Sequence, residues 1–263
     1  PEVDFLLGNL LYTRMHLCIW DELSNDLNEL TKKIINNEKV IAPFYLLGLI
    51  DDPELQRKTA EIYVNDAFPK SYILPEIGLY PKHKKIRIGY FSADFWNHPV
   101  SALTAELYEV HDRNQFEIHA FSYGPDTKDK MSLRIKAGVD HFHEVGSMSH
   151  KDIAILARSL EIDIAVDLGG HTEDAGTGIF ALSAAPIQAS YIGYLGTIGA
   201  DYYDYLVADQ TLIPEQNQKH YSEKIVYLPS YQVNDSTQSP PEIILTRKDL
   251  ELPEEGFVFC CFN

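Results

Sequence analysis

Apolar residues recur at helical spacing in the first quarter of the chain. Steps of three or four positions connect the apolar residues between Leu7 and Cys18 and again between Leu23 and Ile34. This spacing predicts two amphipathic helices, with Asp21 as the N-cap of the second. Pro53 follows Asp52 in a further cap-and-proline pattern, which predicts a helix through about Phe68. Paired helices with short joints suggest the end of a helical-repeat array, although one copy does not establish a period.

The pattern changes after residue 85, where short apolar runs alternate with amphipathic stretches of about ten residues. Such alternation predicts βαβ units, a mostly parallel sheet and right-handed crossovers. The expected strands are Ile86–Phe91, Phe116–Ser122, His141–Val145, Asp163–Leu168, Ile187–Ile192, Tyr205–Ala208 and Lys224–Leu228.

Proline and glycine mark the expected domain boundaries. Pro69, Pro75 and Pro81 punctuate the exit from the helices and place a boundary near residues 80–85. The chain loosens again after Leu228, and a last apolar run, Phe257–Phe262, is expected to open the first strand of a second lobe. We therefore expect a helical segment at 1–80, an α/β lobe at 81–235, and a linker with a truncated lobe at 236–263. The missing initial Met also indicates an excised piece of a longer protein.

Composition narrows the class of protein. The 263 residues carry a formal net charge of −17, which argues against a nucleic-acid binder because a polyanion would be repelled. The basic run Lys82–Arg87 is interpreted as a solvated linker. No apolar run is long enough to span a bilayer. Three cysteines, Cys18, Cys260 and Cys261, match no zinc spacing and indicate a reduced, cytoplasmic protein without membrane association.

Two strand-to-loop stretches carry the candidate chemistry. Ile86–Pro99 and Asp163–Thr172 each join an apolar run to a loop with a histidine, His98 and His171. Ligands of open α/β sheets bind beyond the carboxyl ends of the strands, so both imidazoles are expected on one rim. Asp167, near the end of its strand, is either a buried partner or a base, and the structural role is favoured.

Each histidine also has an ordinary explanation. His98 precedes Pro99, so it lies near a helix N-terminus, where the dipole favours a neutral imidazole; it could equally be a capping or surface residue. His171 follows Gly169-Gly170, which permits close approach to a ligand or only a tight turn. Nucleotide-binding GxGxxG and P-loop motifs, the GxSxG elbow and HExxH are all missing from the sequence.

Several motifs together resemble the catalytic region of the protein O-linked N-acetylglucosamine transferase and SPINDLY-like family. The resemblance runs from about Lys85 to Asn263, in the order IRIGYFSADFWNHPVS, VDLGGHT, FALSAAPIQASYIGYLGTIGADYYDYLVAD and YSEKIVYLPSYQVND. The helical segment resembles the connection between that family's tetratricopeptide repeats and its catalytic part. The fold class implied is α/β: the Rossmann-like first lobe of a two-lobed, GT-B-type glycosyltransferase, preceded by an α-helical repeat-like segment.

The resemblance also implies an activity. Members of the family transfer N-acetylglucosamine from UDP-N-acetylglucosamine to Ser or Thr hydroxyls of proteins, invert the anomeric centre, and need no metal or other cofactor. Plant SPINDLY-type members use GDP-fucose instead. The second lobe holds most of the nucleotide, so this piece alone is expected to be inactive.

Site residues follow from the same motifs. The catalytic candidates are His98, His171 and Asp167, with His98 polarising the acceptor hydroxyl. The substrate-binding candidates are Asn97, Pro99, Gly169, Gly170, Thr172, Gln188, Tyr194, Gly196 and Thr197. The turn has Gly-His-Thr where animal members have Gly-Tyr-Thr, so His171 is not a family-wide catalytic residue. A non-catalytic protein-binding module and a nucleotide-sugar epimerase remain as alternatives to the transferase.

Overall fold

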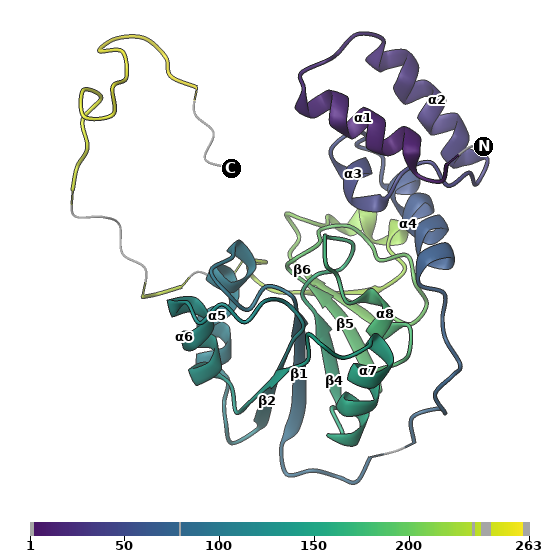
Figure 1. The fold of residues 1–263 in the computed structure, drawn as a ribbon, viewed down its shortest axis with the longest axis vertical. Helices are drawn as coiled ribbons and strands as arrows, with labels where there is room; N and C mark the ends of the chain where they lie inside the picture. Colours follow the sequence, from purple (N-terminus) through teal and green to yellow (C-terminus); the bar gives the residue numbers. More distant parts are fainter. Residues whose placement is uncertain (1–2, 79, 233–234, 238–242, 260–263) are drawn as a thin grey trace.

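A computed structural model describes residues 3–78, 80–232, 235–237 and 243–259. Figure 1 shows a helical segment standing above an α/β lobe, with a long connection descending beside the lobe to its first strand. The helices of the segment are α1 (Leu6–His16), α2 (Leu23–Ile35), α3 (Pro43–Leu47) and α4 (Pro53–Ala67). None of the described helices is long and apolar enough to cross a membrane.

Local chemistry explains where α4 begins, and it corrects one expectation for α2. Asp52 Oδ1 accepts hydrogen bonds from the backbone N–H groups of Glu54 at 3.0 Å and Leu55 at 3.2 Å, as the sequence predicts. The N-cap of α2, however, is Glu22, with a left-handed φ of 61° and no side-chain cap. The prediction of Asp21 as this cap was wrong, because α2 begins one residue later than expected; the Asp21 backbone carbonyl accepts a bond from Arg14.

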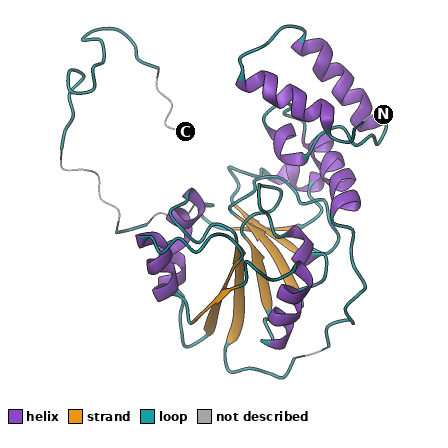
Figure 2. Ribbon diagram, in the orientation of Figure 1, coloured by secondary structure: helices purple, strands orange, loops and turns teal. Residues whose placement is uncertain are grey.

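The lobe is built on a seven-stranded sheet in the order β3-β2-β1-β4-β5-β6-β7, and every neighbouring pair is parallel (Figure 2). This confirms the predicted parallel α/β fold. The strands are β1 (Ile86–Ser92), β2 (Phe116–Ser122), β3 (His141–Glu144), β4 (Ile164–Asp167), β5 (Ile187–Tyr191), β6 (Tyr205–Ala208) and β7 (Lys224–Tyr227).

Helices cover both faces of the sheet because successive side chains of its strands point to opposite sides. On one face Tyr90 and Ile118 pack with Tyr108 of α5 and Ile135 of α6. On the other face Phe91 stacks on Phe121, with ring centroids 4.3 Å apart. The helices of the lobe are α5 (Pro99–Val110), α6 (Lys130–Gly138), α7 (His150–Ser159), α8 (Thr177–Phe180) and the 3₁₀ helix η1 (Glu215–His220).

The helical segment docks onto the lobe through α4. Val64 belongs to the same apolar core as Phe91, and the Tyr202 hydroxyl donates to the Phe68 carbonyl at 2.8 Å. Arg57 adds a bond from its guanidinium to the Lys219 carbonyl at 2.9 Å. These contacts fix the position of the helices over one end of the sheet.

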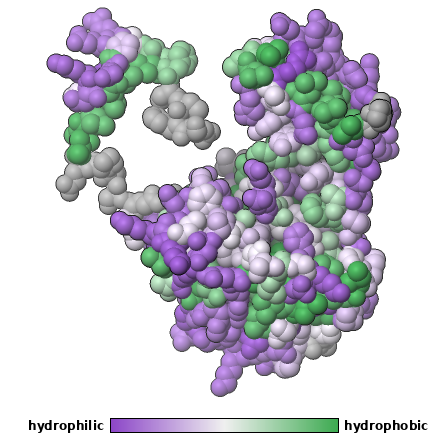
Figure 3. Space-filling view, viewed as in Figure 1, coloured by the Kyte–Doolittle hydropathy of each residue, from purple (hydrophilic) through white to green (hydrophobic). Residues whose placement is uncertain are grey.

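Two stretches of apolar side chain face solvent. Figure 3 shows apolar atoms on the helical segment, where Leu10 and Leu17 are exposed, and on the C-terminal stretch. Phe257 and Phe259 are 82% and 91% exposed and belong to no strand of the described chain, so the strand of a second lobe expected there stays a prediction. An unpaired apolar run lacks the neighbouring strand that would satisfy its backbone groups. The rest of Phe257–Phe262 lies outside the described residues.

Candidate functional site

The order in which strands are added to the sheet reverses between β1 and β4, which lie side by side. Strands β2 and β3 extend the sheet on one side of β1, and β5, β6 and β7 extend it on the other side of β4. The loops beyond the carboxyl ends of β1 and β4 therefore part, and ligands of open α/β sheets bind at such a switch point.

A cavity of about 900 Å³ lies at this switch point. Its floor comes from the loops that follow β1, β4 and β5, and the helical segment supplies its opposite wall. The lobe contributes Asp94, Trp96, His98, Val100, Gly170, His171, Thr172, Glu173, Asp174, Ala175, Thr177 and Gly193. His98 and His171 thus line one cavity, as predicted from the two strand-to-loop stretches.

Aromatic rings form much of the wall that the helical segment supplies. Tyr12 of α1, Tyr45 of α3 and Tyr63 of α4 line the cavity together with Phe44 and Phe68. The ring centroids of Tyr12 and Tyr45 are 4.4 Å apart, and Tyr63 meets the His171 ring edge-to-face at 5.3 Å. Such a wall offers flat apolar surface with hydroxyl groups at its margin, which suits a peptide or a sugar.

His98 reaches the cavity from the N-terminus of α5. Its Nδ1 accepts a hydrogen bond from the Val100 backbone N–H at 3.3 Å, so the residue is the N-cap of the helix. The same Nδ1 lies 3.6 Å from a carboxylate oxygen of Asp94, and the His98 side chain is 31% exposed. His98 therefore caps α5 and also lines the cavity, so the capping role and the site role expected from the sequence are compatible.

Asp94 stands beside His98 at the cavity wall. Burial raises the pKa of this carboxyl, and the charge of His98 opposes the shift. The contact with Val100 places the lone pair of the neutral ring on Nδ1. The other tautomer gives up that contact, directs Nδ1–H toward Asp94 and exposes the Nε2 lone pair, which can accept a proton. The pair can thus act as an oriented base. Sequence reasoning missed Asp94, although it lies four residues before His98 in the same motif.

The His171 ring is buried and held in one tautomer. Its Nε2 lies 2.8 Å from the carbonyl oxygen of Ile198, which can only accept, so Nε2 carries the proton. The buried Nδ1 has no hydrogen-bond partner within the described residues. Burial lowers the pKa of His171 to about 4. The ring is neutral at pH 7 and packs between Tyr63 and Tyr194.

Asp167 shapes the loop after β4 from below. It is fully buried; Oδ1 accepts the backbone N–H groups of Gly169 at 2.9 Å and Gly170 at 3.2 Å, and Oδ2 accepts the Tyr203 hydroxyl at 2.5 Å. Burial raises the pKa of its carboxyl, which the three hydrogen bonds oppose. Asp167 does not line the cavity, so the geometry assigns it to positioning the loop rather than to contact with substrate.

Four predicted substrate-binding residues point into the protein interior. Gln188 donates to the carbonyls of Phe180 and Tyr202 and accepts from Ala184, so its amide is fully engaged. The Thr197 hydroxyl bonds the buried Glu223 at 2.7 Å. The other two are Tyr194 and Gly196, and none of the four lines the cavity. In this lobe their strand-to-loop segment supports the cavity floor, and their contact with substrate stays a prediction.

Of the remaining predictions, Gly170 and Thr172 line the cavity, whereas Asn97, Pro99 and Gly169 do not. Pro99 is the first residue of α5, and the Asn97 backbone N–H donates to Asp129 at 3.0 Å. The aromatic wall was missed because nothing in the sequence shows which face of α4 turns toward the loops.

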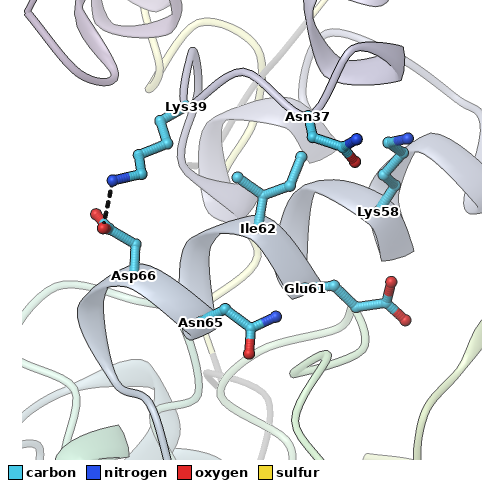
Figure 4. A pocket seen from close by; sticks show the side chains of 7 residues that line it. All are labelled: Asn37, Lys39, Lys58, Glu61, Ile62, Asn65 and Asp66. Atoms are coloured by element: carbon cyan, nitrogen blue, oxygen red, sulfur yellow. Dashed lines mark hydrogen bonds and ion pairs between the residues drawn. The ribbon is translucent and has the colours of Figure 1, made fainter.

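A second hollow, of about 390 Å³, lies on the outer side of α4 (Figure 4). Lys39 and Asp66 form an ion pair across it at 2.5 Å, and Lys58 donates to the Ile35 carbonyl. Its charges are therefore satisfied within the helical segment. It offers no imidazole or buried acid, so the cavity at the switch point is the better candidate site.

The parallel sheet and the cavity at its switch point define the chain as a Rossmann-like α/β lobe with a candidate ligand site beyond the carboxyl ends of its strands. A solved structure of a Thermobaculum terrenum O-GlcNAc transferase mutant superimposes with a TM-score of 0.70 at 26% identity, covering 90% of this chain and 45% of that one. The family model for glycosyl transferase family 41 matches residues 68–242. The chain belongs to glycosyl transferase family 41.

Curated relatives carry related names. A probable UDP-N-acetylglucosamine–peptide N-acetylglucosaminyltransferase, SEC, of Arabidopsis thaliana is 34% identical over 97% of this chain and 28% of its own length. A UDP-N-acetylglucosamine–peptide N-acetylglucosaminyltransferase of Caenorhabditis elegans is 30% identical over 59% of this chain and 14% of its own length. The chain thus spans less than a third of these relatives.

Proposed function

We propose that this chain is the first lobe and helical lead-in of an inverting glycosyltransferase that moves N-acetylglucosamine from UDP-N-acetylglucosamine to Ser or Thr hydroxyls of proteins. The observation that carries the proposal is His98, presented with Asp94 at a 900 Å³ cavity in a chain of glycosyl transferase family 41. The names of the relatives support the donor and the peptide acceptor.

The reaction is a direct displacement at the anomeric carbon. The acceptor oxygen attacks from the face opposite the diphosphate, the new C–O bond forms, and the bond to the diphosphate oxygen breaks with its electron pair. The hydroxyl proton passes to His98 Nε2 while Asp94 orients the ring. Holding hydroxyl and sugar together in one cavity supplies much of the rate. No metal or cofactor takes part in this proposal.

The acceptor side fits the wall that the helical segment supplies. A Ser or Thr in an extended peptide can lie against the rings of Tyr12, Tyr45 and Tyr63, with its hydroxyl directed toward His98. His171 Nδ1 is a neutral acceptor beneath the same surface. The donor nucleotide is assigned mainly to the second lobe, which would stabilise the charge of the leaving diphosphate.

The test is nucleotide release by the complete protein, supplied with UDP-N-acetylglucosamine or GDP-fucose and a cell-extract acceptor. UDP release with labelled N-acetylglucosamine on protein supports the proposal. GDP release with labelled fucose instead would move the protein to the GDP-fucose donor. No release with either donor from a folded sample would favour a non-catalytic protein-binding module.

His98→Ala tests the role of the imidazole. Loss of a positioned general base lowers turnover by about 10²- to 10⁴-fold. His220→Ala, on η1 and outside the cavity lining, is the matched control and should leave turnover unchanged. Near-normal turnover in the His98 variant would remove His98 from the mechanism.

A further inference from the structure

A second group of imidazoles lies outside the cavity, on the face of the sheet that also carries Phe121. Glu117 and His119 are two residues apart on β2, and His141 and His143 are two residues apart on β3, so each pair points to one face. His119 stands directly opposite His141 in the register of the two strands. Parallel pairing therefore gathers one carboxylate and three imidazoles at one edge of the sheet.

The distances within this cluster match those of a metal site. Glu117, His119 and His141 each offer a ligand atom, and these atoms lie within 4.8 Å of one another. Glu117 Oε1 is 3.0 Å from His119 Nε2 and 3.5 Å from His141 Nε2. Bonds of about 2.0–2.1 Å around a tetrahedral Zn²⁺ place neighbouring ligand atoms about 3.4 Å apart. The cluster thus needs only small side-chain movements to surround an ion.

His143 supplies the contact that a metal-binding imidazole usually needs on its other nitrogen. Its Nε2 lies 3.0 Å from His119 Nδ1. A His119 tautomer with the proton on Nδ1 donates to His143 and leaves the Nε2 lone pair facing Glu117 and His141.

The neighbouring Arg87 and the exposure of His141 determine how a metal ion could reach the site. Arg87 Nε lies 3.7 Å from Glu117 Oε1, which opposes a second cation, but the Arg87 guanidinium also pairs with Glu161 at 3.2 Å. The His141 side chain is 51% exposed whereas that of His119 is 3% exposed, so the site opens on the His141 side. An ion can enter there and keep a water molecule as its fourth ligand.

We propose that Glu117, His119 and His141 bind a divalent transition-metal ion, Zn²⁺ by preference, with His143 orienting His119. Two imidazoles and one carboxylate form a ligand set suited to zinc. None of the four residues lines the cavity, so the site is separate from the proposed transfer reaction. The inference does not depend on the proposed function.

The ion would fasten β3 to the sheet. Within the described part of the chain, β3 has four residues and pairs only with β2, so it forms one edge of the sheet. A ligand from each strand closes a bridge across this short pairing. Because the metal binds the folded arrangement, it stabilises the native state as its concentration rises.

The experiment is calorimetric titration of the tag-free protein with Zn²⁺, combined with thermal unfolding at rising Zn²⁺ concentration. We expect one ion per chain and an unfolding temperature that increases with zinc. His141→Ala, at the exposed ligand, should abolish both effects without perturbing the core, and His16→Ala should retain them. Removal of the orienting residue in His143→Ala should weaken zinc binding by roughly 10- to 100-fold, and His143→Gln, which keeps an acceptor, should restore part of it.

Three results would overturn the proposal. They are the lack of saturable binding to the folded wild-type protein below millimolar zinc, unchanged binding in His141→Ala, and equal losses in His141→Ala and His16→Ala. His119→Gln serves as a second test of the buried ligand, since it retains hydrogen-bonding groups of similar reach. Full zinc affinity in that folded variant would also contradict the assignment.

Discussion

The Nε2 of His171 lies 2.8 Å from the carbonyl oxygen of Ile198, and this contact joins the loop after β4 to the segment that follows β5. It orients a neutral, buried imidazole at the base of the cavity. The loops at the switch point are therefore joined by a polar contact, which the Nε2–H donates in the neutral ring and in the imidazolium alike.

Stability should respond to pH through His171. Its folded pKa is about 4 and its unfolded pKa about 6.5, so the unfolded chain binds more protons between these values. The free energy of unfolding should fall as pH decreases from about 6.5 to 4, by at most about 1.4 kcal/mol per pH unit for this one group, and be level above 6.5. Urea denaturation at pH 7, 6 and 5 measures the slope.

His171→Gln should reduce that slope, because glutamine keeps a donor for Ile198 and does not titrate. Other histidines with lowered pKa values, such as His150, would maintain the rest of the slope. The exposed His16→Gln is the matched control and should preserve the wild-type slope. An unaltered slope in His171→Gln would show that His171 already titrates in the folded state as it does in the unfolded chain.

Asp167→Asn should destabilise the protein by about 1–3 kcal/mol. The asparagine oxygen can keep the N–H groups of Gly169 and Gly170, but the Tyr203 hydroxyl then loses its charged acceptor in a fully buried position. Adding Tyr203→Phe to Asp167→Asn should lower the free energy of unfolding only slightly further. Urea denaturation of the two single variants and the double variant should then give a coupling energy of about 0.5–3 kcal/mol. Strictly additive losses would mean that the two side chains act independently.

Much of the lobe could be predicted because its signals are local. The strands predicted between residues 86 and 228 each occur within a residue or two of their observed limits, since apolar runs between turn residues specify strands in a buried parallel sheet. The sequence also predicted that His98 and His171 lie at the same end of the sheet, because chain order and strand direction place both loops there. The short helix α8 was missed, because Thr177–Phe180 is too brief to show a helical period.

The burial of polar residues could not be predicted in the same way. Gln188 and Thr197 lie in a glycine- and tyrosine-rich segment that suggests a binding lip, yet their partners, Tyr202 and Glu223, are 14 and 26 residues distant. Such contacts arise only when the fold is complete. The resemblance to a family pointed to this segment, and in this lobe Gln188 and Thr197 face the interior.

Asp52→Ala should weaken α4 and, through it, the aromatic wall of the cavity. The substitution removes the acceptor for Glu54 and Leu55 and should lower the free energy of unfolding by about 1 kcal/mol. Asp51→Ala, at the exposed neighbouring position, is the control and should change stability little. Equal effects of the two substitutions in thermal unfolding would indicate a charge effect rather than capping.

Asp94→Asn should lower kcat more than it changes KM, since Asp94 orients His98 and is not proposed to bind the nucleotide. A positioning residue is expected to contribute roughly one to two orders of magnitude, less than the base itself. In His98→Ala the further change Asp94→Asn should have almost no effect on kcat. Multiplicative losses in the double variant would contradict a role for Asp94 that acts through His98.

Gly199→Ala should separate the helical segment from the lobe. Gly199 has a φ of +75°, and a Cβ there would lie 2.6 Å from the Glu61 backbone nitrogen and 2.7 Å from the Ala60 carbonyl carbon of α4. The clash is with helix backbone, which cannot turn aside, so we expect a loss above about 1–2 kcal/mol. Gly78→Ala is the matched control, since nothing lies within 4 Å of its added Cβ. Hydrogen exchange should show faster exchange in α4 for the Gly199 variant alone; wild-type protection of α4 in that variant would mean that close contact with Gly199 does not hold the helix in place.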